Sequence, residues 1–222
     1  MATIASSLQA VKQRIEKTAK IPVALLAVSK TWPADAIKEA FDAGQKAFGE
    51  SYVQEALEKM KVLSDLDLEW HFIGPIQSNK VKSIAAHFNW VHSIDREKIA
   101  KKLSESRSGM PPLQVCIQVN ISGEASKSGA APGEVLHLAQ VIDGLQNLKL
   151  RGLMAIPEPT DDVKLQRARF AELRQLRDDL CEKGYHLDTL SMGMSDDMES
   201  AILEGSTMVR VGSAIFGSRQ TT

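Results

Sequence analysis

A lysine directly follows an apolar run near the beginning of the chain. The stretch "LLAVSKTWP" covers residues 25–33 and places Lys30 between four apolar residues and the pair Trp32 and Pro33. An ammonium group is costly to bury without a partner, and burial lowers the pKa of a lysine by up to about 3–5 units. The neutral amine is a nucleophile that forms a Schiff base with an aldehyde. Position alone leaves a second interpretation open, in which the side chain only extends into solvent from a strand end.

Small and hydroxyl-bearing residues gather near the other end of the chain. The segment "TLSMGMSDDMESAI" carries Ser191, Gly193 and Ser195, and "VRVGSAIFGSR" carries Gly212 and Ser213. Small residues permit close approach of the backbone, hydroxyls add donors, and N–H groups at a helix start favour an anion. The two segments therefore indicate a phosphate site, and an amine beside them indicates a phosphate ester that bears an aldehyde.

Two acidic residues follow the first of these segments. We expect Asp196 and Asp197 in the first turn of a helix, where carboxylates stabilise the helix dipole. Without histidines nearby they are poor metal ligands. The sequence therefore predicts no metal site.

Short β-rich runs alternate with longer helical patterns along the whole sequence, after a predicted helix over residues 2–19. Eight runs are predicted as strands, at residues 23–29, 46–49, 69–74, 90–94, 113–120, 148–156, 187–192 and 207–212. Each return to the sheet needs a crossover, so the strands should pair in parallel. Eight such units predict an α/β fold, a single-domain (β/α)8 TIM barrel over residues 1–222 with an extra N-terminal helix. A doubly wound open sheet is the alternative.

The barrel brings the chemical groups together. Essentially all such barrels place their chemistry at the carboxyl ends of the strands, and many bind phosphate with the loops after strands seven and eight. Lys30 follows the first strand, on which the eighth strand closes. The predicted amine and the predicted phosphate site should therefore lie close together.

The overall composition argues against several classes of partner. Lysine and arginine number 27 against 28 acidic residues, a net charge of −1, so no basic field favours nucleic acid or an anionic membrane. No apolar run approaches the ~20 residues that a bilayer span needs. Two cysteines, Cys116 and Cys181, lack metal-ligand spacing and should be free thiols. We expect a soluble, cytoplasmic protein.

Six long motifs resemble those of the pyridoxal phosphate homeostasis protein family, in family order and across nearly the whole chain. They are "AVSKT", "FGESYVQEA", "WHFIGPIQSNK", "GLMAIP", "SMGMSDDMESAI" and "STMVRVGSAIFG". The resemblance implies an alanine-racemase-like barrel (fold type III) that holds pyridoxal 5′-phosphate (PLP) as a Schiff base on Lys30. It also implies that the phosphate-binding segments contain Ser191, Gly193, Met194, Ser195, Gly212 and Ser213.

The resemblance further implies that Arg210 faces the pyridine nitrogen of PLP. A guanidinium is always protonated and offers only donors, so that nitrogen would accept a hydrogen bond and stay unprotonated. PLP would then be a weak electron sink. From the strand position alone, a surface ion pair remains an alternative for Arg210.

Three functions account for these features to different degrees. The resemblance implies a PLP-binding protein of vitamin B6 homeostasis that delivers PLP to apo-enzymes and has no committed reaction. A PLP-dependent amino-acid racemase needs a second base, supplied in alanine racemase by a tyrosine from another domain or subunit. The chain offers only Tyr52 and Tyr185, the latter expected at the opposite face of the barrel. A class I aldolase explains the lysine and the phosphate site but not Arg210. We expect a monomer, since the domain that completes the racemase dimer is missing.

Three residues near the predicted mouth of the barrel have roles that the sequence leaves open. Ser51 stands where the family commonly carries asparagine, and the pair of Ser51 and Gln54 predicts a capping box for the next helix. Lys127 either attracts a phosphate or a second aldehyde or is a solvated loop lysine. His71 is either a proton donor at the mouth or a structural histidine.

Overall fold

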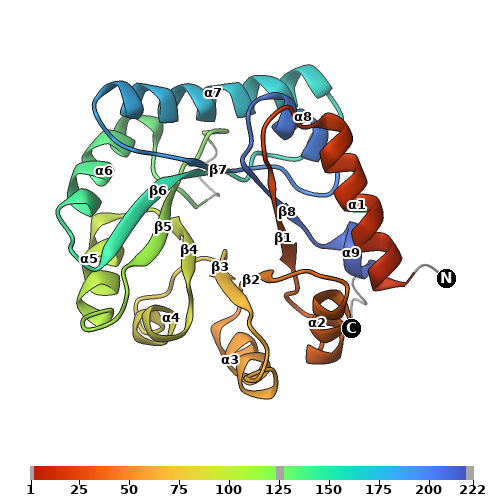
Figure 1. The fold of residues 1–222 in the computed structure, drawn as a ribbon. Coiled ribbons are helices and arrows are strands. Elements are labelled where there is room, and N and C mark those ends of the chain that lie inside the picture. Colours follow the sequence, from red (N-terminus) through yellow and green to blue (C-terminus); the bar gives the residue numbers. More distant parts are fainter. Residues whose placement is uncertain (1–2, 124–127, 219–222) are drawn as a thin grey trace.

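Eight short apolar runs pair in parallel and in chain order to form a closed barrel (Figure 1). The structure is a computed structural model that describes residues 3–123 and 128–218. The strands are β1 (Ala24–Val28), β2 (Ala47–Glu50), β3 (Glu69–Phe72), β4 (Trp90–Ile94), β5 (Leu113–Gln118), β6 (Leu148–Met154), β7 (Thr189–Ser191) and β8 (Met208–Val211). The predicted barrel is confirmed, and the open-sheet alternative is wrong because β8 pairs with β1.

The helices lie outside the barrel and cover its strands (Figure 1). They are α1 (Ile4–Thr18), α2 (Ala34–Asp42), α3 (Val53–Val62), α4 (Val81–His87), α5 (Glu97–Ser106), α6 (Val135–Asp143), α7 (Val163–Glu182), α8 (Met198–Leu203) and α9 (Ser213–Phe216), with a 3-10 turn at Pro132–Glu134. None of the helices in the described ranges is long and apolar enough to cross a bilayer.

The predicted N-terminal helix is confirmed as α1. The Thr3 side chain caps it by accepting a hydrogen bond from the Ser6 N–H, and Leu8, Val11 and Ile15 form its buried stripe. This stripe faces the barrel because α1 packs against α2, α8 and α9 (Figure 1). The first helix of the chain therefore supports the last two.

Polar side chains lie inside the barrel along with the apolar core. His92 on β4 is within hydrogen-bond distance of Ser191 on β7, at 2.8 Å, and both are fully buried. Since β4 and β7 are not neighbours in the sheet, this contact crosses the barrel interior. The interior is thus partly a hydrogen-bonded network.

Two predicted helix starts are wrong. No side chain caps α3, which begins at Val53 with Tyr52 at the N-cap position, so the capping box predicted for Ser51 does not form. The helix forms without it because Val53 and Ala56 bury its inner face. The helix α8 begins at Met198, after both predicted acidic residues. Asp197 Oδ1 instead accepts a hydrogen bond from the Met194 N–H at 2.6 Å, which holds a turn ahead of the helix.

Gly152 on β6 provides a test of the barrel geometry. A Cβ atom at this position would lie 1.7 Å from the carbonyl oxygen of Thr189 on β7, a distance that requires the strands to separate. Gly152→Ala should therefore lower the free energy of unfolding by about 3 kcal/mol or more in urea denaturation. Gly133→Ala is the control, because a Cβ there meets nothing within 4 Å. Equal stabilities of the two variants would contradict this register of β6 and β7.

Candidate functional site

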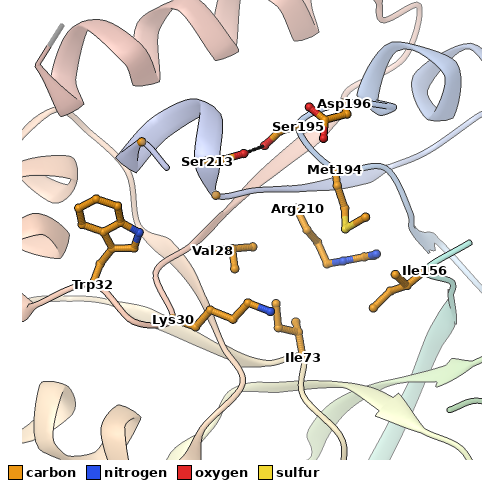
Figure 2. A pocket seen from close by; sticks show the side chains of 12 residues that line it. Val28, Lys30, Trp32, Ile73, Ile156, Met194, Ser195, Asp196, Arg210 and Ser213 are labelled. Atoms are coloured by element: carbon orange, nitrogen blue, oxygen red, sulfur yellow. Dashed lines mark hydrogen bonds between the residues drawn. The ribbon is translucent and has the colours of Figure 1, made fainter. Parts of the chain in front are cut away.

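A cavity of about 300 Å³ opens where the carboxyl ends of β1 and β8 meet (Figure 2). Six of the eight residues predicted for the site line it: Lys30, Met194, Ser195, Arg210, Gly212 and Ser213. They come from the segments after β1 and β7 and from β8 and the start of α9. The volume lies at the lower end of the range for small-molecule sites.

Lys30 lies two residues after the end of β1 and contributes its side chain to the cavity wall. Figure 2 shows the side chain passing Val28 and directed toward Ile73, with its amine at the inner end. The residue is half-buried. A lysine that only extended into solvent from the strand end would not line the cavity, so the geometry disfavours that interpretation.

Arg210 lies within β8 and is only 3% exposed. Its Nη1 donates to the carbonyl oxygen and the hydroxyl of Ser191 at 2.6 and 2.8 Å, and its Nη2 donates to the carbonyl oxygen of Ala155 at 2.8 Å. Burial lowers the pKa of Arg210 to about 10, so the guanidinium remains charged at neutral pH. The alternative of a surface ion pair is wrong, because the group is enclosed by the barrel.

A chain of hydrogen bonds runs from Arg210 through the barrel interior. Ser191 Oγ lies 2.8 Å from His92 Nδ1, His92 Nε2 lies 2.9 Å from His71 Nδ1, and His71 Nε2 lies 2.7 Å from the Glu69 carboxylate. The carboxylate only accepts, so His71 donates its Nε2–H to Glu69, and each neutral imidazole has one donor and one acceptor nitrogen, which fixes the direction of the other two bonds. Ser191 donates to His92, His92 donates to His71, and His71 donates to Glu69.

Both histidines are neutral in this arrangement. Burial holds the pKa of His92 well below its usual value, and the neighbouring His71 and Arg210 lower it further. Burial also lowers the pKa of His71, against the opposing effect of Glu69. Of the two interpretations of His71, that of a proton donor at the mouth is wrong, because the residue is fully buried within β3 and its ring stacks on Trp90. It is a structural histidine.

Two of the three serines predicted for the phosphate site meet at one end of the cavity. Ser213 and Ser195 are joined by a hydrogen bond between their hydroxyl groups (Figure 2). The two Oγ atoms lie 3.0 Å apart, and Ser195 Oγ accepts from the Ala214 N–H at 3.4 Å. Arg14 of α1 fixes the same loop, since its Nη2 donates to the Ser195 carbonyl oxygen at 3.3 Å. The N-terminal helix therefore helps to position the hydroxyl groups.

Ser191 and Gly193, also predicted for the site, lie behind the cavity wall. Ser191 is fully buried and contacts Arg210, as described above. Gly193 has a φ of 96°, and a Cβ there would lie 2.6 Å from the Cβ of Ala201. Its carbonyl oxygen accepts from the backbone N–H of Arg210 at 2.9 Å. Ser191 and Gly193 thus support the cavity wall from behind through their contacts with Arg210, and they do not line the cavity themselves.

Sequence reasoning missed several residues of the cavity wall: Val28, Trp32, Ile73, Ile156, Asp196 and Gly217. Trp32 stacks on Phe216 of α9 with ring centroids 5.9 Å apart, which closes one side of the cavity. Trp32 lies two residues after Lys30, and this proximity in the sequence could have predicted it as a residue of the cavity wall. Asp196 is exposed at the rim beside Ser195, where water screens its charge (Figure 2).

Lys127 lies outside the described residues, so its predicted roles are not placed. Within the part of the chain that the structure describes, no cluster of three or more histidine, cysteine or acidic side chains is arranged to hold a metal. Cys116 and Cys181 are free thiols, and burial raises the pKa of Cys116 to about 12. Its thiol is therefore unreactive.

The buried histidines predict a loss of stability in acid. An unfolded histidine has a pKa near 6.5, and His92 in the fold has a much lower one. Below about pH 6.5 the unfolded chain thus binds more protons, and the free energy of unfolding falls by up to about 1.4 kcal/mol per pH unit for each such histidine.

Urea denaturation between pH 7 and 5 measures this slope. His92→Gln should show a smaller slope than the parent, and His186→Gln, at an exposed position, should keep the parent slope. A slope unchanged in His92→Gln would show that this histidine is not buried in the neutral form.

Comparison with known proteins gives the same family over nearly the whole sequence. Residues 2–220 match the family model described as alanine racemase, N-terminal domain. The pyridoxal phosphate homeostasis protein of Pseudomonas aeruginosa is 58% identical over 226 residues, covering 99% of this chain and 97% of that protein. The protein of the same name from Vibrio cholerae is 55% identical over 221 residues, covering 97% and 93%.

Solved structures agree with this assignment. PipY of Synechococcus elongatus, solved with PLP bound, is 36% identical with a TM-score of 0.87, covering 97% of this chain and 100% of that chain. Alanine racemase of Corynebacterium glutamicum is 18% identical with a TM-score of 0.73 and shows the same fold, with 98% of this chain and 61% of that chain covered. The chain belongs to the family of pyridoxal phosphate homeostasis proteins.

Proposed function

We propose that this chain binds PLP through Lys30, serves intracellular PLP homeostasis and delivers PLP to apo-enzymes. One observation carries the proposal: an amine, a buried guanidinium and a pair of hydroxyls line the same cavity. PLP has three matching polar parts, an aldehyde, a pyridine nitrogen and a phosphate. When bound, it supplies an aldehyde that condenses with a primary amine and releases water. PipY, solved with PLP, and the curated relatives support this choice of ligand.

Each residue of the cavity has a distinct task. Lys30 supplies the amine nitrogen, which must first lose its proton. Ser195 and Ser213 present hydroxyl groups for the phosphate oxygens, and Gly212 allows close approach of β8 to β1, since a Cβ there would lie 3.2 Å from the Val28 carbonyl oxygen. The apolar walls at Ile73 and Ile156 fit the faces of an aromatic ring.

Arg210 determines what kind of chemistry the site favours. Its guanidinium stays protonated and has only donors, so the pyridine nitrogen facing it must accept and remain unprotonated. An unprotonated ring withdraws electrons weakly. The site is therefore better suited to holding PLP than to stabilising a carbanion on a substrate.

The positions of the tyrosines also favour a carrier over a racemase. Neither Tyr52 nor Tyr185 is among the cavity-lining residues of the described chain. Tyr185 lies between α7 and β7, beside the amino-terminal ends of β6 and β7. A tyrosine that could serve as the second base is thus missing from the cavity wall that the described residues form.

A single barrel domain over residues 1–222 is supported by a family match that runs from residue 2 to 220. The proposal includes a monomer in the cytoplasm without nucleic-acid partners, and a net charge of −1 supports the absence of nucleic-acid partners.

Borohydride trapping tests the role of Lys30. Reduction of the PLP-loaded protein should leave a pyridoxyl group on the peptide that contains Lys30, identified by mass spectrometry. Lys30→Ala should lower the total label at least about tenfold, because no other amine lines the cavity within the described residues. Lys98→Ala, at an exposed position of α5, is the matched control and should label like the parent. Label on another lysine in the parent would refute the assignment.

Chiral chromatography tests the carrier against the racemase. The PLP-loaded protein, incubated with L-alanine in deuterated water, should form D-alanine no faster than free PLP does. Incorporation of deuterium at Cα should likewise stay at the rate of free PLP. Turnover to D-alanine would make the racemase the better function.

A further inference from the structure

Two charged residues of α3 bind the backbone on either side of Lys30. Lys59 Nζ donates to the carbonyl oxygen of Ser29 at 2.8 Å, and Glu55 Oε1 accepts from the backbone N–H of Thr31 at 2.6 Å. Neither Glu55 nor Lys59 lines the cavity. The residues before and after the proposed PLP-binding lysine are therefore held from behind by the same helix.

The two side chains belong to a buried ionic network. Lys59 is 6% exposed, and its Nζ lies 2.7 Å from Glu50 Oε1 and 2.5 Å from Glu55 Oε1. Ser29 Oγ also donates to Glu50 Oε1, at 2.7 Å. One ammonium thus joins the end of β2, the helix α3 and the backbone before Lys30.

Thr31 has a backbone conformation that needs such support. Its φ is 70°, the one positive φ at a non-glycine position among the described residues. A β-branched residue is disfavoured in this left-handed region, so the conformation persists only where contacts hold it. The bond from the Thr31 N–H to Glu55 is such a contact, and the turn it stabilises sets the direction in which Lys30 leaves the strand.

We propose that Glu55 and Lys59 are positioning residues for Lys30: together they hold Ser29 and Thr31 and so aim the lysine side chain into the cavity. This inference rests on the proposed function of Lys30 in binding PLP. It assigns the two α3 residues no contact with PLP. Their effect is on how fast the amine reaches a bound aldehyde.

Timed borohydride trapping of Glu55 variants tests the proposal. Glu55→Ala removes the acceptor for the Thr31 N–H and should slow pyridoxyl labelling of Lys30 about tenfold, the factor that corresponds to one hydrogen bond. Glu55→Gln keeps an acceptor oxygen and should label within about threefold of the parent. Glu58→Ala removes an exposed carboxylate of the same helix and should label like the parent.

Hydrogen exchange of the Thr31 amide provides a readout that needs no PLP. Exchange should be faster in Glu55→Ala than in the parent and unchanged in Glu58→Ala. Parent-like labelling of Lys30 in Glu55→Ala, with or without faster exchange, would overturn the positioning role. If the parent protein takes no label on Lys30, the proposed function itself is refuted. If the Thr31 amide exchanges in Glu55→Ala as slowly as in the parent, the backbone contact is refuted.

A double-mutant cycle with Thr31 separates positioning from a general effect on the fold. Thr31→Gly relieves the positive φ, so removal of Glu55 in that background should slow labelling by only about threefold instead of tenfold. Equal losses in both backgrounds would contradict an action of Glu55 through Thr31.

Lys59 needs a paired variant, because its removal alone leaves the Glu50 carboxylate buried without its partner. Glu50→Gln combined with Lys59→Met removes one negative and one positive charge, so the net charge of the network is unchanged and no carboxylate is left buried at position 50. It should remain folded by circular dichroism and label Lys30 more slowly than the Glu50→Gln single variant. Equal labelling rates of these two variants would refute the role of Lys59.

Discussion

The parallel pairing of β1 with β8 is the constraint on which the site depends. Leu26 pairs with Arg210 and Ala27 with Val211, so the first and last strands of the barrel lie side by side. This register brings Lys30, close to the beginning of the chain, beside Ser213, close to its end. Without closure the amine and the hydroxyl pair would lie at opposite edges of a sheet. Closure of the barrel therefore creates the cavity as well as the fold.

The buried charge of Arg210 imposes a second constraint. A guanidinium inside a barrel is tolerated only where its donors find acceptors, and Ser191 and Ala155 provide them. The hydroxyl of Ser191 in turn donates to His92, and the chain of hydrogen bonds continues through His71 to the Glu69 carboxylate. Each member fixes the protonation of the next. The polar interior is thus a consequence of placing one permanent cation at the floor of the cavity.

Sequence reasoning predicted the barrel well, because the spacing of apolar runs reports directly on which strands are buried. It also brought Lys30 together with Ser195 and Ser213, since the order of strands in a closed barrel is determined by the order along the chain. It failed for contacts that depend on where side chains point. His71 was placed at the mouth with the polar residues that follow the third strand, but it lies within β3, and alternation along the strand turns its side chain into the interior. The capping box at Ser51 failed because the helix begins one residue too late for it.

The contacts of Glu55 and Lys59 could not be predicted from the sequence either, because they too depend on where side chains point. Charged residues on a helix ordinarily face solvent, and only the packing of α3 beside the end of β1 places this pair behind Lys30. The proposed function requires that PLP lies between Lys30 and Arg210 with its phosphate at Ser195 and Ser213. A crystal structure of the protein grown with PLP tests it most directly. We predict electron density continuous from Lys30 Nζ to the ring, the pyridine nitrogen within hydrogen-bond distance of Arg210 and the phosphate within that distance of both serine hydroxyls. Density for PLP elsewhere, or a phosphate remote from the serines, would contradict the account.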